Sequence, residues 1–319
     1  ITFHNEMDAK AFNVKKTGIL AELRSMRHNQ KYLAKEMLIT NMFAHSNYSK
    51  TLDQKINKIS SINMSDLENF YNNTLKHPME YYCTLVTKSK EQEGPMKTIL
   101  KNMKNFNGQK QVKPLWIPLP LKHETSSKVI SGYKSSLVLI GQTTPFKIYT
   151  DESYLLMLGL EPIGSSITSR LMHTIRVEKG CGTYGVYGNV YMQTHAPSYV
   201  VFNATFSPKD QGRGVNYMHD IIDNWIEHGI TSDELNTAKK QLMGARSLEM
   251  DNMNVVSSVF HRHLHNNKNA TAEWNRYENI IKKATLNQVN SVIKKALQRK
   301  KFITVSVGPP CAHDDSDSD

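Results

Sequence analysis

The sequence predicts an α+β fold in which helices pack on one face of a mixed or antiparallel sheet, arranged as two units of which the first is truncated. Three observations lead to this prediction. A chain of 319 residues is long enough for two ordinary domains. Short segments rich in β-branched and aromatic residues alternate with longer segments of helical periodicity. A charged and polar stretch containing Gly-Pro and Asn-Gly separates two such groups, and these dipeptides are typical of a linker.

The composition is that of a folded protein, with 39% hydrophobic residues, 22% charged residues and a mean hydropathy of -0.50. No apolar run approaches the roughly 20 residues that span a bilayer, and the N-terminus does not resemble a signal peptide. Cys83, Cys181 and Cys311 have neither metal-binding nor redox spacing. We therefore expect a soluble, intracellular protein, in the cytoplasm or an organelle matrix, with no membrane partner.

The net charge of +11 does not by itself identify the class of binding partner. A basic surface attracts nucleic acids or acidic peptides, but it also simply keeps a protein soluble. The chain has no Gly-rich phosphate loop and no basic patch interleaved with aromatic residues. We expect no nucleic-acid partner.

The first part of the chain is mainly helical. Apolar residues at helical spacing over 8–45, interrupted near Arg27, predict two helices or one kinked helix. Ser65 and Glu68 form a candidate capping box that begins a short helix. A β-branched and aromatic run over 78–87 predicts a buried strand.

The second part alternates strands and helices. Strand patterns occur at 128–144, 198–206 and 302–307, and an apolar helix covers 154–160. One helix ends at Gly229, the next is capped by Thr231 and runs to about His265, and the last is capped by Thr285. These elements predict four regions: the back half of an N-terminal domain (1–88), a linker (89–115), a C-terminal domain (116–308) and an acidic disordered tail (309–319).

The stretch from Ser165 to Gly188 connects a helix to a strand. Ile167, Leu171 and Ile175 lie on one face of the expected helix, and glycines then break the pattern before an alternating run. Arg176 stands at the end of this helix and Tyr184 at the start of the strand. The two polar side chains are expected to point toward whatever lies beside the sheet.

This stretch resembles the "Ser-Arg-Leu … Ile-Arg-Glu-Lys-Gly … Tyr-Gly" signature of the pitrilysin/insulinase family of zinc metallopeptidases, with one extra residue between arginine and tyrosine. A second resemblance lies at Gly18–Leu23, which is similar to the family's "Val-x-x-Glu-Leu" helix. The resemblance implies that Glu22 is the third zinc ligand, and that Arg176 and Tyr184 hold the substrate carbonyl or the oxyanion. A carboxylate is an ordinary zinc ligand, and a cation and a phenol stabilise developing negative charge.

The family's zinc motif, His-X-X-Glu-His, is absent from the chain. His261 and His265 have the i, i+4 spacing of a zinc site, but no acidic residue lies between them, and Phe260 and Leu264 favour a helix whose apolar side faces the sheet. A zinc ion is therefore expected only if a segment or sister subunit outside this sequence supplies the motif.

Two hypotheses remain open. In the first, the chain is the zinc-ligand-donating and substrate-binding portion of a metalloendopeptidase that hydrolyses peptides. In the second, it is a non-catalytic family member that acts as a partner subunit or binds a peptide. Lys15, at a position where many relatives have a second glutamate, the longer Arg-to-Tyr spacing and the missing zinc motif favour the second.

Overall fold

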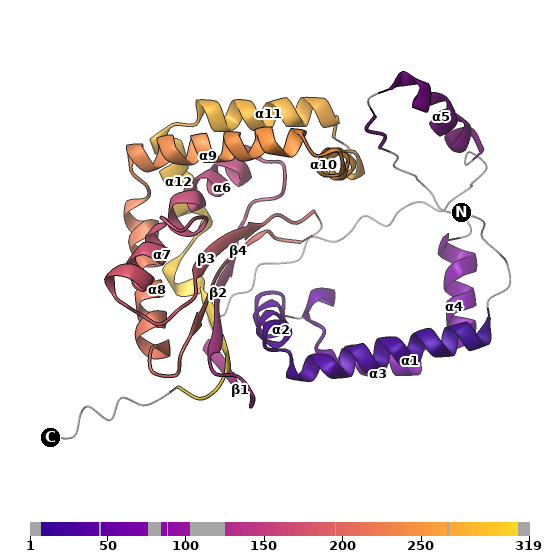
Figure 1. The fold of residues 1–319 in the computed structure, drawn as a ribbon, viewed down its shortest axis with the longest axis horizontal. Helices are drawn as coiled ribbons and strands as arrows, with labels where there is room; N and C mark the ends of the chain where they lie inside the picture. The colour runs from indigo at the N-terminus through magenta and orange to yellow at the C-terminus, as the bar shows by residue number, and fades with distance from the viewer. Residues whose placement is uncertain are drawn as a thin grey trace. The chain divides into compact units, whose positions relative to one another are not determined.

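A computed structural model describes residues 8–44, 46–75, 84–87, 89–102, 125–194, 196–266 and 268–311. These residues fall into two compact units, each described below by itself. The first unit is drawn from Ile1–Ser25, Leu52–Pro114 and Gly244–Arg276. The second, which holds the sheet, is drawn from Met26–Thr51, Leu115–Met243 and Tyr277–Asp319. The predicted α+β class, with a mixed sheet, is confirmed (Figure 1).

The sheet has five strands in the order β1-β5-β2-β4-β3. β5 pairs in parallel with β1 and antiparallel with β2, while β4 lies antiparallel between β2 and β3. β1 and β3 are therefore the two edges of the sheet among the described strands. The bounds are β1 Thr125–Val129, β2 Ser136–Thr143, β3 Val186–Tyr191, β4 Tyr199–Phe206 and β5 Ile303–Gly308.

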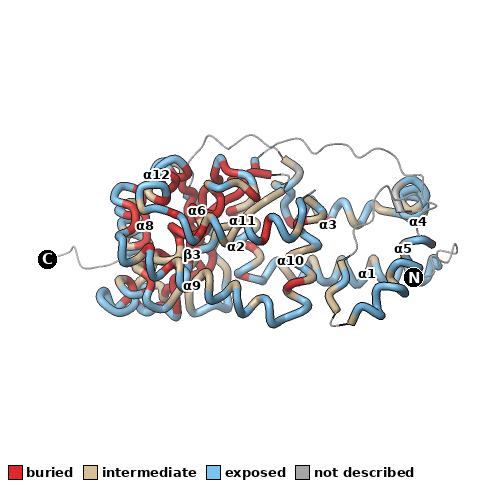
Figure 2. The backbone as a smooth tube through the Cα atoms, turned by 90° about the horizontal axis from the view of Figure 1, so that it is seen from above, coloured by how far each residue is buried: buried red, intermediate tan, exposed pale blue. Residues whose placement is uncertain are grey.

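Both faces of the central strands are covered. This burial on two sides explains why the sequence of β2 is a continuous apolar run. Val138 and Ile140 point into the larger of two hydrophobic clusters, while Leu137 and Leu139 point into the smaller one. Successive side chains of a strand face opposite sides, so a strand between two helical layers has no polar face. Buried residues accordingly concentrate around the sheet (Figure 2).

The larger cluster lies between the sheet and a layer of helices. Gly164, at the end of one of them, lies so close to the backbone of Gly188 in β3 that a Cβ would clash with it. The close approach of helix and strand therefore depends on glycine at position 164. The helices of this layer are α6 Asp151–Gly164, α7 Arg170–Met172, α8 Gln211–His228 and α12 Leu286–Ala296.

The opposite face is covered by α2, Gln30–Met42. Leu33 and Leu38 pack on this face, and the Gln30 side chain donates 2.7 Å hydrogen bonds to the backbone oxygens of Ser135 and Val307. Asn29 caps the helix by accepting from the backbone N–H of Tyr32. The sequence predicted helices on one face of the sheet only. The structure also has a helix on the second face, and this helix comes from the region 1–88, which was predicted to be a separate domain. The proposed regions 1–88, 89–115, 116–308 and 309–319 stay predictions.

The first unit is helical in the described residues. Lys16 of its first helix donates hydrogen bonds of 2.8 and 2.7 Å to the backbone oxygens of Ser60 and Ile62 at the end of another. Its complete helices are α1 Ala9–Ser25, α3 Leu52–Ser61, α4 Met64–Phe70, α5 Glu93–Asn102 and α10 Met253–His265; α9 Ser232–Met250 and α11 Ala270–Lys283 belong in part to each unit.

Local signals located several helix ends correctly. The interruption near Arg27 is a 3₁₀ turn, Gly229 ends α8 with a φ of 75°, and Thr285 forms a capping box with Gln288. One cap was predicted wrongly: α4 begins with a capping box of Asn63 and Asp66, not of Ser65 and Glu68. Asn63 is extended and exchanges both hydrogen bonds with Asp66, so the helix begins two residues earlier.

Two further predictions differ from the structure. The helix expected to run from Thr231 to about His265 is interrupted, because the Asn252 side chain accepts from two backbone N–H groups and starts α10 anew. The helix expected to include Ile167 begins only at Arg170, and Ile167 is 71% exposed. Residues 78–83 of the predicted strand, 103–115 of the linker and 312–319 of the tail lie outside the described residues, and the described end of that strand, 84–87, has no strand structure.

The described helices include none with both the length and the apolar character needed to cross a membrane.

Candidate functional site

The candidate site is built on the connection between α7 and β3. After α7 the chain continues as a π-helical turn, His173–Glu178. Gly180 then adopts a φ of 61°, a conformation that glycine enters without strain. The Cys181 N–H donates to the backbone oxygen of Ile175 at 3.1 Å, which closes the end of the turn. π-helical turns often mark functional sites, and this one carries Arg176.

Arg176 and Tyr184 lie together, although not through their side chains. The Arg176 guanidinium donates a 3.0 Å hydrogen bond to the backbone oxygen of Tyr184. The Tyr184 side chain is 84% exposed, and Arg176 is also exposed. The arginine therefore holds the loop, while the phenol projects into solvent at the start of an edge strand. Their assignment to a substrate carbonyl or an oxyanion stays a prediction.

Asp210 fixes the same loop from the start of α8. Its carboxylate accepts from the Gly182 N–H at 3.1 Å, from the Ser207 hydroxyl at 2.9 Å and from Arg213 at 2.7 Å. The hydrogen bonds from Arg213 and Ser207 lower the pKa of Asp210, with a smaller contribution from Gly182. A Cβ on Gly182 would lie 2.9 Å from the carboxylate, so the residue must be small.

Asp210 was not predicted from the sequence as part of the site. The only local signal is the run from Ser207 to Asp210, which is typical of a helix start and gives no partner. Cys181, in the same loop, is buried, and burial raises the pKa of its thiol. It is therefore an ill-suited nucleophile at neutral pH.

Strand β3 follows the loop directly. Tyr187 and Tyr191 point away from the helical layer and are 39% and 42% exposed. Tyr191 stacks on Tyr199 of β4 with ring centroids 4.8 Å apart. Burial and the neighbouring Tyr191 raise the pKa of Tyr199 to about 12. Exposed aromatic side chains at a sheet edge are typical of surfaces that bind peptides.

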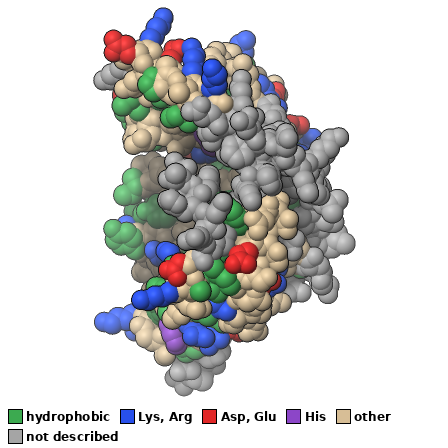
Figure 3. Space-filling model, turned by 90° about the vertical axis from the view of Figure 1, so that its right-hand side faces the viewer, with side chains coloured by type: hydrophobic (Ala, Val, Ile, Leu, Met, Phe, Trp, Pro, Cys, Tyr) green, Lys and Arg blue, Asp and Glu red, His purple; other side chains and the backbone are tan. Residues whose placement is uncertain are grey.

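A groove of about 300 Å³ lies beside these tyrosines, between α2 and the sheet. Its floor is apolar, formed by Leu139 and Val201 among others, and Lys31 and Lys35 of α2 lie at its side. Figure 3 shows hydrophobic, basic and acidic side chains of the described residues together on one face of the molecule.

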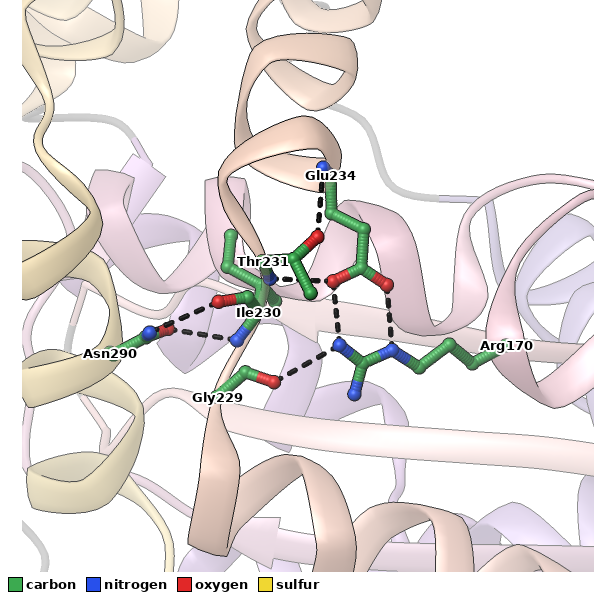
Figure 4. Close-up of polar contacts among 6 residues, drawn as sticks. All are labelled: Arg170, Gly229, Ile230, Thr231, Glu234 and Asn290. Carbon is green, nitrogen blue, oxygen red and sulfur yellow. Dashed lines mark hydrogen bonds and ion pairs between the residues drawn. The ribbon is translucent and has the colours of Figure 1, made fainter.

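Arg170, another residue of the signature, has a structural role (Figure 4). It binds both carboxylate oxygens of Glu234, at 2.7 and 2.6 Å, and donates to the backbone oxygen of Gly229 at 3.1 Å. Glu234 also completes the predicted cap of α9 by accepting from the Thr231 N–H and donating its own N–H to the Thr231 hydroxyl. Burial raises the pKa of Glu234, but the bonds from Arg170 and Thr231 outweigh it and lower the pKa.

Glu22 lies on α1, in the first unit, and is exposed. Its backbone oxygen accepts from the Ser25 hydroxyl at 2.7 Å. Within the described ranges, no group of three His, Cys, Asp or Glu side chains is placed to hold a metal ion. These residues alone do not fit a zinc ion, so a ligand role for Glu22 stays a prediction that needs donors from elsewhere.

The histidines of α10 differ in how far they are buried. His261 and His265 are exposed, whereas His263 between them is buried. Burial lowers the pKa of His263, which lies near Glu273, Arg246 and Arg262.

Residues 61–242, more than half of the chain, match the family described as Peptidase M16 inactive domain. The chain belongs to this family. The resemblance of the Arg176 and Tyr184 segment to pitrilysin/insulinase peptidases is thereby confirmed. A curated relative is the "Non-peptidase homolog YmxG" of Helicobacter pylori, 28% identical over 301 residues, which cover 88% of this chain and 63% of that protein. The chain thus spans less than two thirds of this relative.

Solved structures show the same fold. The peptidase M16 inactive domain from Pseudomonas fluorescens superimposes with a TM-score of 0.80 at 18% identity, over 96% of this chain and 72% of that one. A protease from Helicobacter pylori gives 0.79 at 15% identity, over 95% and 73%. A chain of Complex III2 from Candida albicans gives 0.71 at 12% identity, over 92% and 70%.

The family and its relative favour the second of the two hypotheses drawn from the sequence. The matching domain is described as inactive, and the curated relative as a non-peptidase. A zinc-dependent hydrolysis by this chain has no such support.

Proposed function

We propose that this chain is a non-catalytic M16 protein that binds an extended peptide along strand β3, with Arg176 and Tyr184 at the start of the binding surface. The observation that carries the proposal is the position of the signature pair. Arg176 holds the loop that leads into an edge strand, and the Tyr184 phenol stands exposed at its start. An edge strand offers backbone N–H and C=O groups to an added strand.

β3 suits a peptide better than β1, the other edge of the described sheet. β1 has the sequence Thr-Ser-Ser-Lys-Val and is mostly exposed and polar. β3 carries Tyr187 and Tyr191, and the apolar groove beside Tyr199 lies next to it. Backbone pairing would supply affinity, while the tyrosines and the groove would select alternate side chains of the peptide.

In this proposal the chain binds peptides but does not hydrolyse them. The His-X-X-Glu-His motif is missing from the sequence, and the family description and the curated relative are both non-catalytic. A sister subunit that presents an extended segment would use the same edge, so co-purification with such a subunit agrees with the proposal.

The test is peptide binding by the purified protein, measured by fluorescence anisotropy with short extended peptides of alternating apolar residues. Replacing Tyr187 and Tyr191 by serine should weaken binding at least tenfold. Val129→Ser is the matched control, because it removes an exposed apolar side chain from the other sheet edge. Equal losses in both variants would contradict a site at β3. Hydrolysis of the peptides by protein that contains stoichiometric zinc would contradict a non-catalytic role.

A further inference from the structure

In the part of the chain that the structure describes, the sheet face on which α2 packs is open over β3. Tyr199 and Val201 of β4 belong to the apolar cluster that α2 covers. The register places Tyr191 of β3 opposite Tyr199, and directly opposite residues of a sheet lie on the same face. Asn189 and Tyr187 share this face by alternation, and all three β3 side chains are exposed. The groove between α2 and the sheet is also lined by Tyr191, so it adjoins the edge strand.

The groove has an apolar floor and a basic side. Leu139 and Val201 lie in the floor, and Lys31 and Lys35 of α2 line the side. The described lining contains no aspartate or glutamate. Among the described residues, no carboxylate forms an ion pair with either lysine, and both lysines are exposed. The groove therefore carries two positive charges that no carboxylate of its lining compensates.

The stability of α2 does not explain these two lysines. Lys31 is the second residue of the helix, whose first turn has no acidic residue. The N-terminus of a helix carries a partial positive charge, so a cation there is unfavourable. Lys35 follows one turn later, and like charges at this spacing repel each other. A carboxylate bound by both ammonium groups would offset both effects. Residues that break a local rule of stability are candidates for a functional role.

We propose that the groove binds an apolar side chain of the peptide together with an adjacent aspartate or glutamate, whose carboxylate is held by Lys31 and Lys35. This preference rests on the proposed function, because the occupant is the peptide that pairs along β3. Such a peptide reaches the groove at Tyr191, which is the last residue of the strand and lines the groove. The volume of about 300 Å³ is at the lower end of ligand sites and suits one or two side chains.

The chemistry of the lining fits these two side chains. An apolar side chain would pack on Leu139 and Val201 in the floor. The ammonium groups would donate to the carboxylate, and a hydrogen bond between two charged groups is stronger than one between neutral groups. A lysine stem can lie along apolar surface while its charged end stays in water. The same groove can therefore bind both kinds of side chain.

The test compares extended peptides that differ in one charge. Each has a leucine beside the variable residue and is blocked at both ends, so only a side chain can supply a carboxylate. The variable residue is glutamate, glutamine or lysine. A fourth peptide has glutamine and a free C-terminal carboxylate, and it tests the other source of the same group. The whole chain is titrated with each peptide, and fluorescence anisotropy gives the affinity.

The groove variant combines Lys31→Gln with Lys35→Gln. The matched control combines Lys240→Gln in α9 with Lys294→Gln in α12, which removes the same charge from exposed lysines of the same unit. This control is needed because a chain with a net charge of +11 attracts acidic peptides over its whole surface. A third variant, Lys35→Glu, reverses one charge of the groove.

The glutamate peptide should bind the unaltered protein about fivefold more tightly than the glutamine peptide at low salt, as expected for two exposed ion pairs. The preference should shrink at high salt, because salt screens exposed charges. It should disappear in the groove variant and persist in the control, with no fall in melting temperature in either. Lys35→Glu should prefer the lysine peptide to the glutamate peptide.

Glutamate and glutamine peptides that bind equally would overturn the acidic preference while leaving peptide binding at β3 intact. A preference lost equally in the control would overturn the role of the two lysines, because it would come from the overall charge. If the glutamine peptide with a free C-terminus binds as tightly as the glutamate peptide, the assignment to a side chain is wrong. Binding that needs the lysines but is unchanged in Tyr187→Ser, outside the lining, would keep the groove and overturn pairing along β3.

Discussion

The guanidinium of Arg176 and the backbone oxygen of Tyr184 are joined by a 3.0 Å hydrogen bond across the glycine-containing loop. The bond assigns different tasks to two residues that the sequence suggested as one catalytic pair. Arg176 holds the shape of the loop, and Tyr184 presents its phenol to solvent. The extra residue between them leaves the contact intact, because the arginine reaches the backbone and not the ring.

Removing Arg176 should therefore loosen the loop more than it unfolds the protein. We expect Arg176→Ala to lower the free energy of unfolding by no more than about 1 kcal/mol, as for an exposed hydrogen bond, and to weaken peptide binding about tenfold. Tyr184→Phe should leave the unfolding free energy unchanged, because the phenol is exposed, and should weaken peptide binding, because it removes the hydroxyl at the start of the proposed binding surface. Urea unfolding and anisotropy measure the two effects. Normal binding by Arg176→Ala would remove this residue from the site.

Gly164→Ala should be severely destabilising, since its new Cβ would lie within 2.7 Å of the Gly188 Cα and even closer to the Gly188 N. Backbone atoms of a sheet cannot move aside, so we expect a loss above about 3 kcal/mol. Gly244→Ala is the matched control in α9, where nothing lies within 4 Å. It should stabilise the helix by up to about 1 kcal/mol. Thermal unfolding of both variants compares them; equal melting temperatures would refute the close packing of α6 on β3.

The Arg170–Glu234 pair should make stability depend on acid pH. The pKa of Glu234 in the folded protein is below its usual value of 4.5. Its contribution is therefore present above pH 4.5 and is lost as the pH falls through the folded-state pKa. Both side chains are 25% exposed, and we expect Glu234→Gln to cost about 1–3 kcal/mol at pH 7.

Below the folded-state pKa of Glu234, the difference between Glu234→Gln and the unaltered protein should shrink. A double-mutant cycle with Arg170→Met isolates the pair from the Thr231 cap. A difference that stays constant as the solution is acidified would show that the ionised carboxylate contributes nothing.

Tyr199 should ionise at a higher pH than an ordinary tyrosine, because its side chain is buried. Its folded-state pKa of about 12, set by burial and by Tyr191, lies above the ordinary value of 10.0. Stability from the neutral phenol is complete below pH 10 and is lost as the pH rises toward 12. The ultraviolet difference spectrum between the protein and Tyr199→Phe reports this titration. A midpoint near the ordinary value would mean that the Tyr191–Tyr199 stack is open to water.

Local features of the sequence correctly predicted those helix ends and strands that depend on interactions between neighbouring residues. The caps at Thr231 and Thr285, the glycine stop at Gly229 and the strands around Leu139 follow from residues a few positions apart. At α4 two overlapping capping patterns competed, and the choice of Asn63 over Ser65 depended on which backbone became extended.

Contacts between distant segments were beyond such reasoning. Asp210 reaches the Gly182 N–H only because β3 and β4 bring α8 next to the loop. The packing of α2 on the second face of the sheet likewise depends on Leu137 and Leu139, about a hundred residues later in the chain. Arg176 and Tyr184 were found through their motif, but the bond to a backbone oxygen had no sequence signal.

The order of strands also has a consequence for biosynthesis. β5 is inserted between β1 and β2, so Thr125 finds its partner Thr304 only after nearly all of the sheet unit has left the ribosome. Until then the nascent chain exposes the apolar edge of β2, and α2 lacks the strand carrying Val305 and Val307 on which it also packs. Unpaired apolar edges invite aggregation during synthesis. Ribosome-bound chains stalled before Ile303 should therefore be substrates for chaperones, and release of the last strand should free them.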